Sequence, residues 1–211
     1  MIKSKFATVA LLVLAATAAR GQSTARVAVA SDSKLWIDGT SNLHAWSCKA
    51  DKLDASIDVD AGAAIALSAA APKALKKVQI HVPSRSLKCN HNGMEGNVYK
   101  ALKADDDASQ ISWVMSSFES APGESKDAFT LHTIGALTIA GVEKKVSVDV
   151  AATRLPDGTI RAVGMVPIKM TDYGITPPTA IFGRLKTGDE VKINFELTVG
   201  AKAIAAALNE K

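Results

Sequence analysis

The side chains best suited to metal binding are spread thinly along this chain. The sequence has two cysteines and four histidines, which are His44, His81, His91 and His132. No two histidines have the H-x-x-x-H spacing of a helical metal site, and no C-x-x-C pair is present. The acidic run 105–107 is typical of a solvated loop. The sequence therefore predicts no metal site.

Catalytic motifs are missing in the same way. The chain has no G-x-S-x-G nucleophile motif and no glycine-rich phosphate loop. No pair of carboxylates is framed by a predicted cleft, as a glycosidase would need. Serine, histidine and aspartate are all present, but no spacing brings them together. We therefore expect no catalytic residues, no cofactor and no enzyme activity.

The first 21 residues predict an exported protein. Lys3 and Lys5 precede an apolar run over residues 6–19, and Arg20-Gly21 follows it. A basic start, a short apolar core and small residues before a polar segment describe a signal peptide. The run is shorter than the roughly 20 residues of a membrane-spanning helix. We expect cleavage near Gly21, one domain over residues 22–211, a periplasmic or secreted location and no stable membrane insertion.

The net charge of +4 comes mainly from that segment. Residues 1–21 contain Lys3, Lys5 and Arg20 and no acid, so 25 basic residues become 22, against 21 acidic ones. The remaining charges alternate in sign and form no basic cluster with interleaved aromatic residues. This pattern argues against a nucleic-acid partner.

Cys48 and Cys89 are the only cysteines. In an exported protein two cysteines are expected to form a disulfide, which here would close a loop of about 40 residues. Two free, buried thiols are the alternative.

The elements that would position these side chains are mostly short β-strands. Apolar and polar residues alternate with a period of two, which indicates strands with one buried and one wet face. The clearest stretches are residues 52–60, 77–82, 145–150 and 191–199. Further strands are expected at Lys34–Thr40, Leu43–Cys48, Gln110–Phe118, Phe129–Ile139 and Thr159–Met170. The pattern is that of an antiparallel sheet with eight or nine strands, and closure would remove its edges.

Three segments depart from this alternation. Residues 92–103 predict a short helix between strands, with Asn92 as its cap and one apolar face formed by Met94, Val98, Ala101 and Leu102. Residues 61–74 are rich in alanine and form either a short helix or a loop. Residues 201–208 add a helical turn or two.

Several motifs resemble the YceI-like family of exported lipid-binding proteins. The first is FTLHTIGALTIAGVEKKVSVDV at residues 129–150, where a strand ending in Leu-Thr-Ile is followed by a Gly-Val-x-Lys turn and a Val-rich strand. TDYGI at 171–175 and GDEVKINFELT at 188–198 follow in the same order. GTSNLHAWSC at 39–48 and the segment at 82–104 resemble a subgroup of this family.

The resemblance implies an all-β fold, an eight-stranded antiparallel lipocalin-like barrel with a short helix between strands. It also implies that the interior binds a polyisoprenoid or another long apolar chain. Eight strands enclose either a core filled by side chains or a space for one slim ligand. Gly135 and Gly164, on inward-facing positions, are compatible with an open interior.

Twelve residues are the candidate ligand contacts. Eleven are apolar residues on the inward-facing side of the predicted strands, and the twelfth, Tyr173, lies in the TDYGI segment. They are Ile57, Ile80, Ile111, Trp113, Met115, Phe129, Leu131, Leu137, Val148, Val166, Tyr173 and Phe195. The alternative for the apolar residues is an ordinary packed core. Tyr173 either presents its hydroxyl to a ligand head group at the barrel mouth or makes a structural hydrogen bond.

The function that these features favour is an exported carrier that sequesters a polyisoprenoid, a quinone-like molecule or a fatty lipid. Its partner would be that apolar ligand, and a homodimer is left open. The alternative is an envelope stress or interaction protein that keeps the barrel scaffold without a bound lipid.

Overall fold

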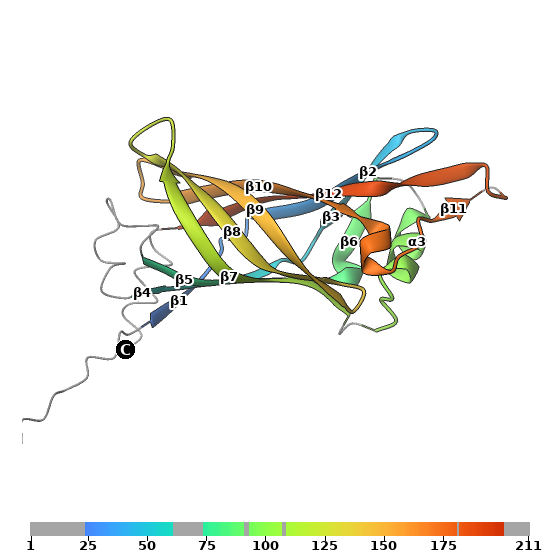
Figure 1. Cartoon of the computed structure of the whole chain (residues 1–211), viewed down its shortest axis with the longest axis horizontal. Helices are drawn as coiled ribbons and strands as arrows, with labels where there is room; N and C mark the ends of the chain where they lie inside the picture. Colours follow the sequence, from blue (N-terminus) through green and yellow to red (C-terminus); the bar gives the residue numbers. More distant parts are fainter. Residues whose placement is uncertain (1–23, 61–73, 91–92, 107–108, 181, 201–211) are drawn as a thin grey trace, which may run out of the picture.

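The computed structural model describes residues 24–60, 74–90, 93–106, 109–180 and 182–200. The predicted signal peptide, the Asn92 cap, the predicted tail helix and all but the last residue of the alanine-rich segment lie outside the described residues. Within them the chain is an antiparallel β-barrel with one short α-helix (Figure 1).

The described residues form twelve strands, one α-helix and two 3-10 turns. The strands are β1 (Thr24–Ala28), β2 (Lys34–Ser41), β3 (Ala45–Ala50), β4 (Asp54–Asp60), β5 (Leu75–Pro83), β6 (Leu87–Cys89), β7 (Gln110–Pro122), β8 (Ala128–Ile139), β9 (Val142–Arg154), β10 (Ile160–Lys169), β11 (Thr179–Ala180) and β12 (Leu185–Val199). The helix is α3 (Met94–Ala101), and the 3-10 turns are η1 (Ser84–Ser86) and η2 (Met170–Tyr173).

The barrel wall consists of eight long spans of chain, and three of these spans are each divided into two strands. β1 and β2 follow one another, as do β3 with β4 and β5 with β6, and each pair is separated by a break of three to five residues. β2 pairs with β3 while β1 pairs with β4, and β3 pairs with β6 while β4 pairs with β5. The predicted eight-stranded, all-β barrel is therefore confirmed as an arrangement of spans. The number of separate strands differs because three spans bend and interrupt their ladders.

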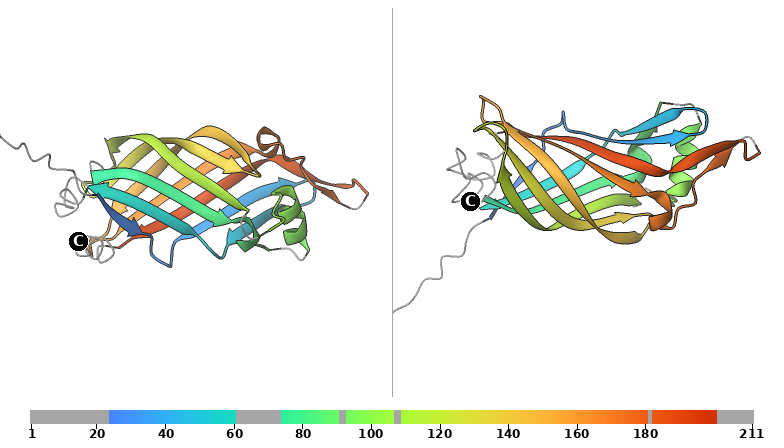
Figure 2. Two further views of the ribbon diagram at one scale, coloured as in Figure 1. Left: turned by 90° about the horizontal axis from the view of Figure 1, so that it is seen from below. Right: turned by 45° about the horizontal axis from the view of Figure 1, so that its top comes forward.

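The ring closes through the pairing of β12 with β2. From there the order runs through β10, β9, β8, β7 and β5 to β4 and β1. The strands wrap obliquely around the interior (Figure 2). Burial alternates along them as predicted, and the buried side chains of β12 are Val191, Ile193, Phe195, Leu197 and Val199.

Tight turns connect β8 to β9 and β9 to β10, at opposite ends of β9. Ala140 and Gly141, between β8 and β9, have φ values of 51° and 81°. Two successive positive φ values match the twist of the flanking strands in a two-residue hairpin turn. Gly158, in the turn between β9 and β10, has φ 81°. Glycine tolerates such φ values without a steric cost, so both turns suit their residues.

The ladder between β9 and β10 covers only part of the two strands. It joins Ile160–Gly164 to Val150–Arg154, after which β10 continues along β12 and β9 along β8. The carbonyl of Thr159 accepts a hydrogen bond from the Leu155 N–H at 2.8 Å, so odd-numbered residues of β10 direct their backbone groups toward β9. Pro167 stands at such a position and has no N–H to donate. Pro167 therefore cannot resume the ladder, which ends three residues earlier at Gly164.

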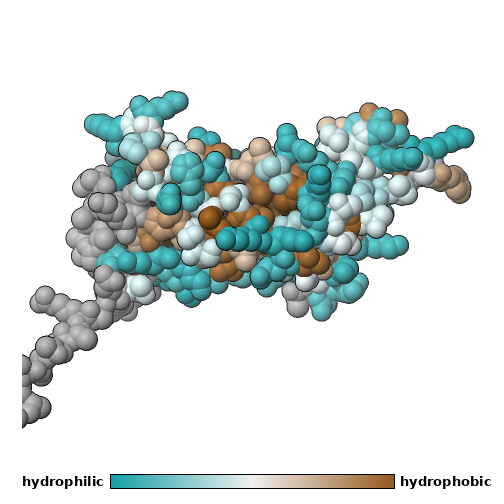
Figure 3. Space-filling view, in the orientation of Figure 1, coloured by the Kyte–Doolittle hydropathy of each residue, from teal (hydrophilic) through white to brown (hydrophobic). Residues whose placement is uncertain are grey.

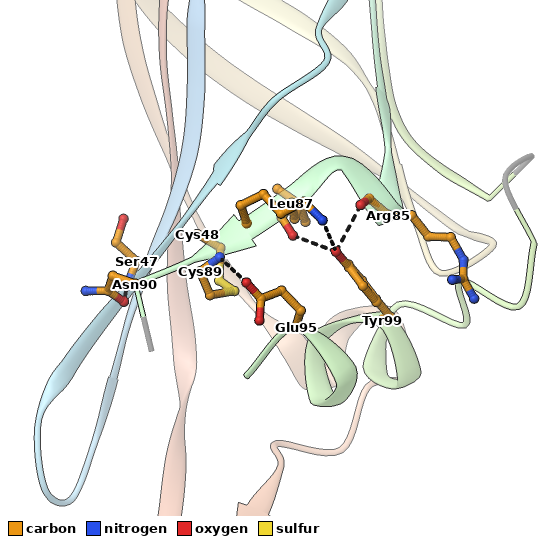
Figure 4. Close-up of a disulfide and its surroundings, with 9 residues drawn as sticks. Ser47, Cys48, Arg85, Leu87, Cys89, Asn90, Glu95 and Tyr99 are labelled. Carbon is orange, nitrogen blue, oxygen red and sulfur yellow. Dashed lines mark hydrogen bonds between the residues drawn. A yellow bond between two sulfur atoms is a disulfide. The ribbon is translucent and has the colours of Figure 1, made fainter. Parts of the chain in front are cut away.

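The helix α3 is held at one end of the barrel beside a disulfide (Figure 4). Cys48 on β3 and Cys89 on β6 are direct partners in the antiparallel register and form the predicted disulfide. Glu95 accepts a hydrogen bond from the Cys89 N–H at 3.1 Å, and this bond lowers the pKa of the Glu95 carboxyl. The Tyr99 hydroxyl lies 3.0 Å from the Leu87 carbonyl oxygen. Both contacts fasten α3 to the disulfide-bonded strand.

Removing the disulfide should destabilise the barrel. The link joins positions 41 residues apart, and closing such a loop is worth about 4 kcal/mol in the chain-entropy estimate. We expect C48A/C89A to lose stability of this order in urea unfolding. Reductant should lower the midpoint of the wild type and leave that of the variant unchanged. Equal midpoints for the two oxidised proteins would contradict the prediction.

Candidate functional site: an apolar cavity in the barrel

The barrel encloses an inner cavity of about 170 Å³. Its lining consists of inward-facing side chains from β1, β2, β4, β5, β7, β8, β9, β10 and β12 and includes no charged residue. Thr133 is the one hydroxyl residue of the lining, and its Oγ1 donates to the Val148 carbonyl at 2.8 Å. A comparable engineered cavity of about 150 Å³ lined by aliphatic and aromatic residues stays dry and binds benzene. This space therefore favours hydrocarbon over water.

Eleven of the twelve predicted contact residues lie together around this cavity. They are Ile57, Ile80, Ile111, Trp113, Met115, Phe129, Leu131, Leu137, Val148, Val166 and Phe195. The structure thus places them where the period-two pattern put them. Their role in holding a ligand stays a prediction.

Tyr173 is separate from that group. It lies in η2, is only 2% exposed and is not part of the lining of either cavity. Burial raises the pKa of its phenol, with a smaller contribution from the neighbouring Asp172 carboxylate. The structure therefore gives no support to a ligand contact through its hydroxyl.

A second, outer cavity of about 350 Å³ adjoins the first. Ile111 and Ile193 line both, so these two side chains lie between the two spaces. The apolar face predicted for the helix, formed by Met94, Val98, Ala101 and Leu102, lines the outer cavity. Polar side chains also border it, namely Ser41, His44, Asn97, Thr179 and Thr187. The outer cavity thus has a mixed apolar and polar lining, whereas the inner one is lined almost entirely by apolar side chains.

Trp46 is a lining residue that the sequence pattern missed. In the sequence Trp46 falls on the opposite parity from Leu43, a pattern that fits a place near the rim, packing under residues 61–74 or a bulge that resets the pleat. In the structure β3 begins only at Ala45, and Leu43 lies in the preceding turn, so the alternation does not run through both residues. Trp46 is buried with Cys48 on the inner face of β3. The parity that Trp46 shares with Cys48 was the available signal.

Three glycines let aromatic rings lie flat against the wall. A Cβ at Gly39 would collide with the Trp46 indole, and one at Gly164 would collide with the Phe195 ring. Gly135 stands in the same relation to the ring of Trp113. Cross-strand aromatic–glycine pairs of this kind fill the space left by the missing side chain. The rings therefore occupy the wall and leave the centre of the barrel free.

Other chemistry is sparse among the described residues. They contain no group of three or more histidine, cysteine or acidic side chains that could hold a metal ion. His132 and Asp149 pair on the outer surface, with Nδ1 2.7 Å from Oδ1. No helix in the part of the chain that the structure describes is long and apolar enough to cross a membrane.

These features define the class: an antiparallel β-barrel that encloses an apolar cavity with a partly polar mouth. The family model of the YceI-like domain matches residues 23–199, and the chain belongs to that family. No curated protein matches it.

Solved structures share the fold at low sequence identity. BcnA of Burkholderia cenocepacia is 20% identical with a TM-score of 0.61, over 81% of this chain and 99% of that one. A polyisoprenoid binding domain from Saccharophagus degradans, described as implicated in plant cell wall breakdown, is 15% identical with a TM-score of 0.59, over 84% and 99%. The YCEI protein of Campylobacter jejuni is 19% identical with a TM-score of 0.52, over 77% and 84%.

Replacing Gly39 by alanine should destabilise the barrel, because the new methyl group would force the Trp46 ring out of its place. Overpacking of this kind costs about 1–3 kcal/mol. Gly96→Ala is the matched control, since Gly96 lies within α3 and a Cβ there meets nothing within 4 Å. It should stabilise by about 0.5–1 kcal/mol. Urea midpoints that move in the same direction for both variants would contradict this account.

Proposed function

We propose that this protein is an exported, non-catalytic carrier that binds one long apolar ligand inside the barrel. The observation that carries the proposal is the pair of adjoining cavities, because the inner one has a lining without charge and the outer one leads to the surface. Removing hydrocarbon from water contributes about 25 cal/mol per Å² of buried area. An extended chain would gain most if it occupied both cavities, with the side chains of Ile111 and Ile193 moving apart to admit it.

The arrangement also orients the ligand. Burying a charged or polar head group without partners is costly, and the inner cavity offers few polar atoms. The outer cavity offers Ser41, His44 and Thr187 beside its apolar surface. We therefore place the tail in the inner cavity and the polar end at the outer one.

The described polyisoprenoid binding by the Saccharophagus degradans domain supports an isoprenoid as the first candidate ligand. Because that domain is only 15% identical to this chain, quinone-like and fatty lipids stay candidates. Export would be checked by the mass of the purified periplasmic protein, which should lack residues 1–21.

Natively purified protein should yield a stoichiometric apolar ligand on organic extraction and mass spectrometry. Ala162→Phe should reduce the yield, because Ala162 lines the inner cavity and a phenyl ring would occupy much of it. Ala151→Phe is the control, since Ala151 is exposed on the outer face of β9 beside Val163 of β10. It should retain the ligand.

Organic extraction and a lipid-uptake assay distinguish a lipid carrier from a barrel scaffold that binds no lipid. Wild-type protein that carries no lipid and takes up none when offered would defeat the carrier proposal. Equal lipid content in Ala162→Phe and Ala151→Phe, with both variants folded by circular dichroism, would contradict the placement of the ligand in the inner cavity.

A further inference from the structure

Two turns project from the barrel at the end that holds α3 (Figure 1). One joins β2 to β3, and the other precedes β12. Leu43 in the first is 67% exposed, and Phe182 in the second is fully exposed. Figure 3 shows apolar side chains on both projections among polar ones. Large apolar side chains that stand in water at the ends of neighbouring turns incur a cost that burial against a partner would remove.

Hydrogen bonds hold these turns together as one unit. The Asn42 side chain donates through Nδ2 to the Arg184 carbonyl at 2.7 Å and accepts through Oδ1 from the Lys186 N–H at 2.9 Å. The Asn42 N–H donates to the Lys186 carbonyl at 3.1 Å. Leu43 and Phe182 are therefore carried by a single structure and can contact the same partner at once.

The charge around these turns has one sign. Residues 39–50 and 173–188 contain no aspartate or glutamate, whereas Arg184 and Lys186 lie beside Phe182. Both cations are exposed, and no ion pair involves either of them among the described residues. An aromatic side chain beside unpaired cations matches a surface that offers hydrocarbon just beneath anionic groups.

The turns also border the mouth of the outer cavity. Ser41 and His44 flank Leu43 and line that cavity, as do Leu185 and Thr187 on the second turn. Whatever covers Leu43 and Phe182 therefore faces the opening through which a ligand would pass.

We propose that the turns bearing Leu43 and Phe182 dock on the surface of an anionic lipid bilayer and hold the cavity mouth against it. This inference rests on the proposed function, because a carrier of long apolar molecules has to exchange them with a membrane. Phe182 and Leu43 insert among the acyl chains near the head groups. Arg184 and Lys186 contact the lipid phosphates.

The test is flotation of the full-length protein, as purified from cells, with vesicles. One set contains phosphatidylcholine alone, and the other contains equal parts of phosphatidylcholine and phosphatidylglycerol. The variants are L43S/F182S and R184Q/K186Q. The matched control is V163S/M165S, because Val163 and Met165 are apolar residues of the β10 wall with exposures of 39% and 44%. Lipid content by extraction is measured on the same preparations.

Wild-type protein should float with the anionic vesicles, and less as salt is raised. L43S/F182S should bind at least about tenfold more weakly, as expected for the loss of two buried apolar side chains. R184Q/K186Q should lose the preference for anionic vesicles, and V163S/M165S should bind as the wild type does.

Wild-type protein that floats with neither vesicle set would overturn the docking proposal, as would equal losses in L43S/F182S and V163S/M165S. Failure of the carrier function would look different. In that case the wild type would yield no extractable lipid, whatever its vesicle binding.

Discussion

The pairing of β12 with β2 joins the last long strand of the chain to the first and closes the sheet on itself. Closure satisfies backbone groups that an open sheet would leave at two edges. It also divides every strand into an inner and an outer face, since successive side chains point to opposite sides. The alternation along β12 places five apolar side chains inside and mostly polar ones outside. Closure therefore produces an apolar interior and an outer surface of water-facing side chains.

Closure alone would not leave room for a ligand, because eight spans can be filled by their own side chains. The glycines decide the outcome here. Gly39, Gly135 and Gly164 allow the rings of Trp46, Trp113 and Phe195 to lie along the wall. Each ring would otherwise extend toward the barrel axis and fill it. The rings thus expose a large apolar area to the cavity without filling its centre. A well-packed wall and an open interior are therefore compatible.

The period of two predicted the long strands and the eleven inner-cavity residues because that pattern is local. The pattern did not predict strands that are set by pairing with distant parts of the chain. β1 and β6 are short and are defined by their partners β4 and β3, so their own residues carry little signal. The face of Trp46 stayed open in the sequence because the alternation is interrupted by the turn before β3. The outer cavity was not foreseen as a space, since it combines α3, a hairpin and η2, which come together only after the sheet has closed.

Tyr173 is the one predicted contact residue that the structure places away from both cavities. Beyond Gly164 and Val150 the ladder between β9 and β10 ends, and Pro167 offers no N–H to continue it. η2 follows directly from β10, and a Cβ added to Gly174 at its end would meet the Val142 side chain at the start of β9. Met170, Tyr173 and Ile175 are all buried in the core cluster there. The tyrosine therefore covers the place where the wall has no backbone ladder, and the raised pKa of its phenol reflects that burial. Burial among these side chains fits the structural alternative for Tyr173, in which packing in the core cluster holds the ring.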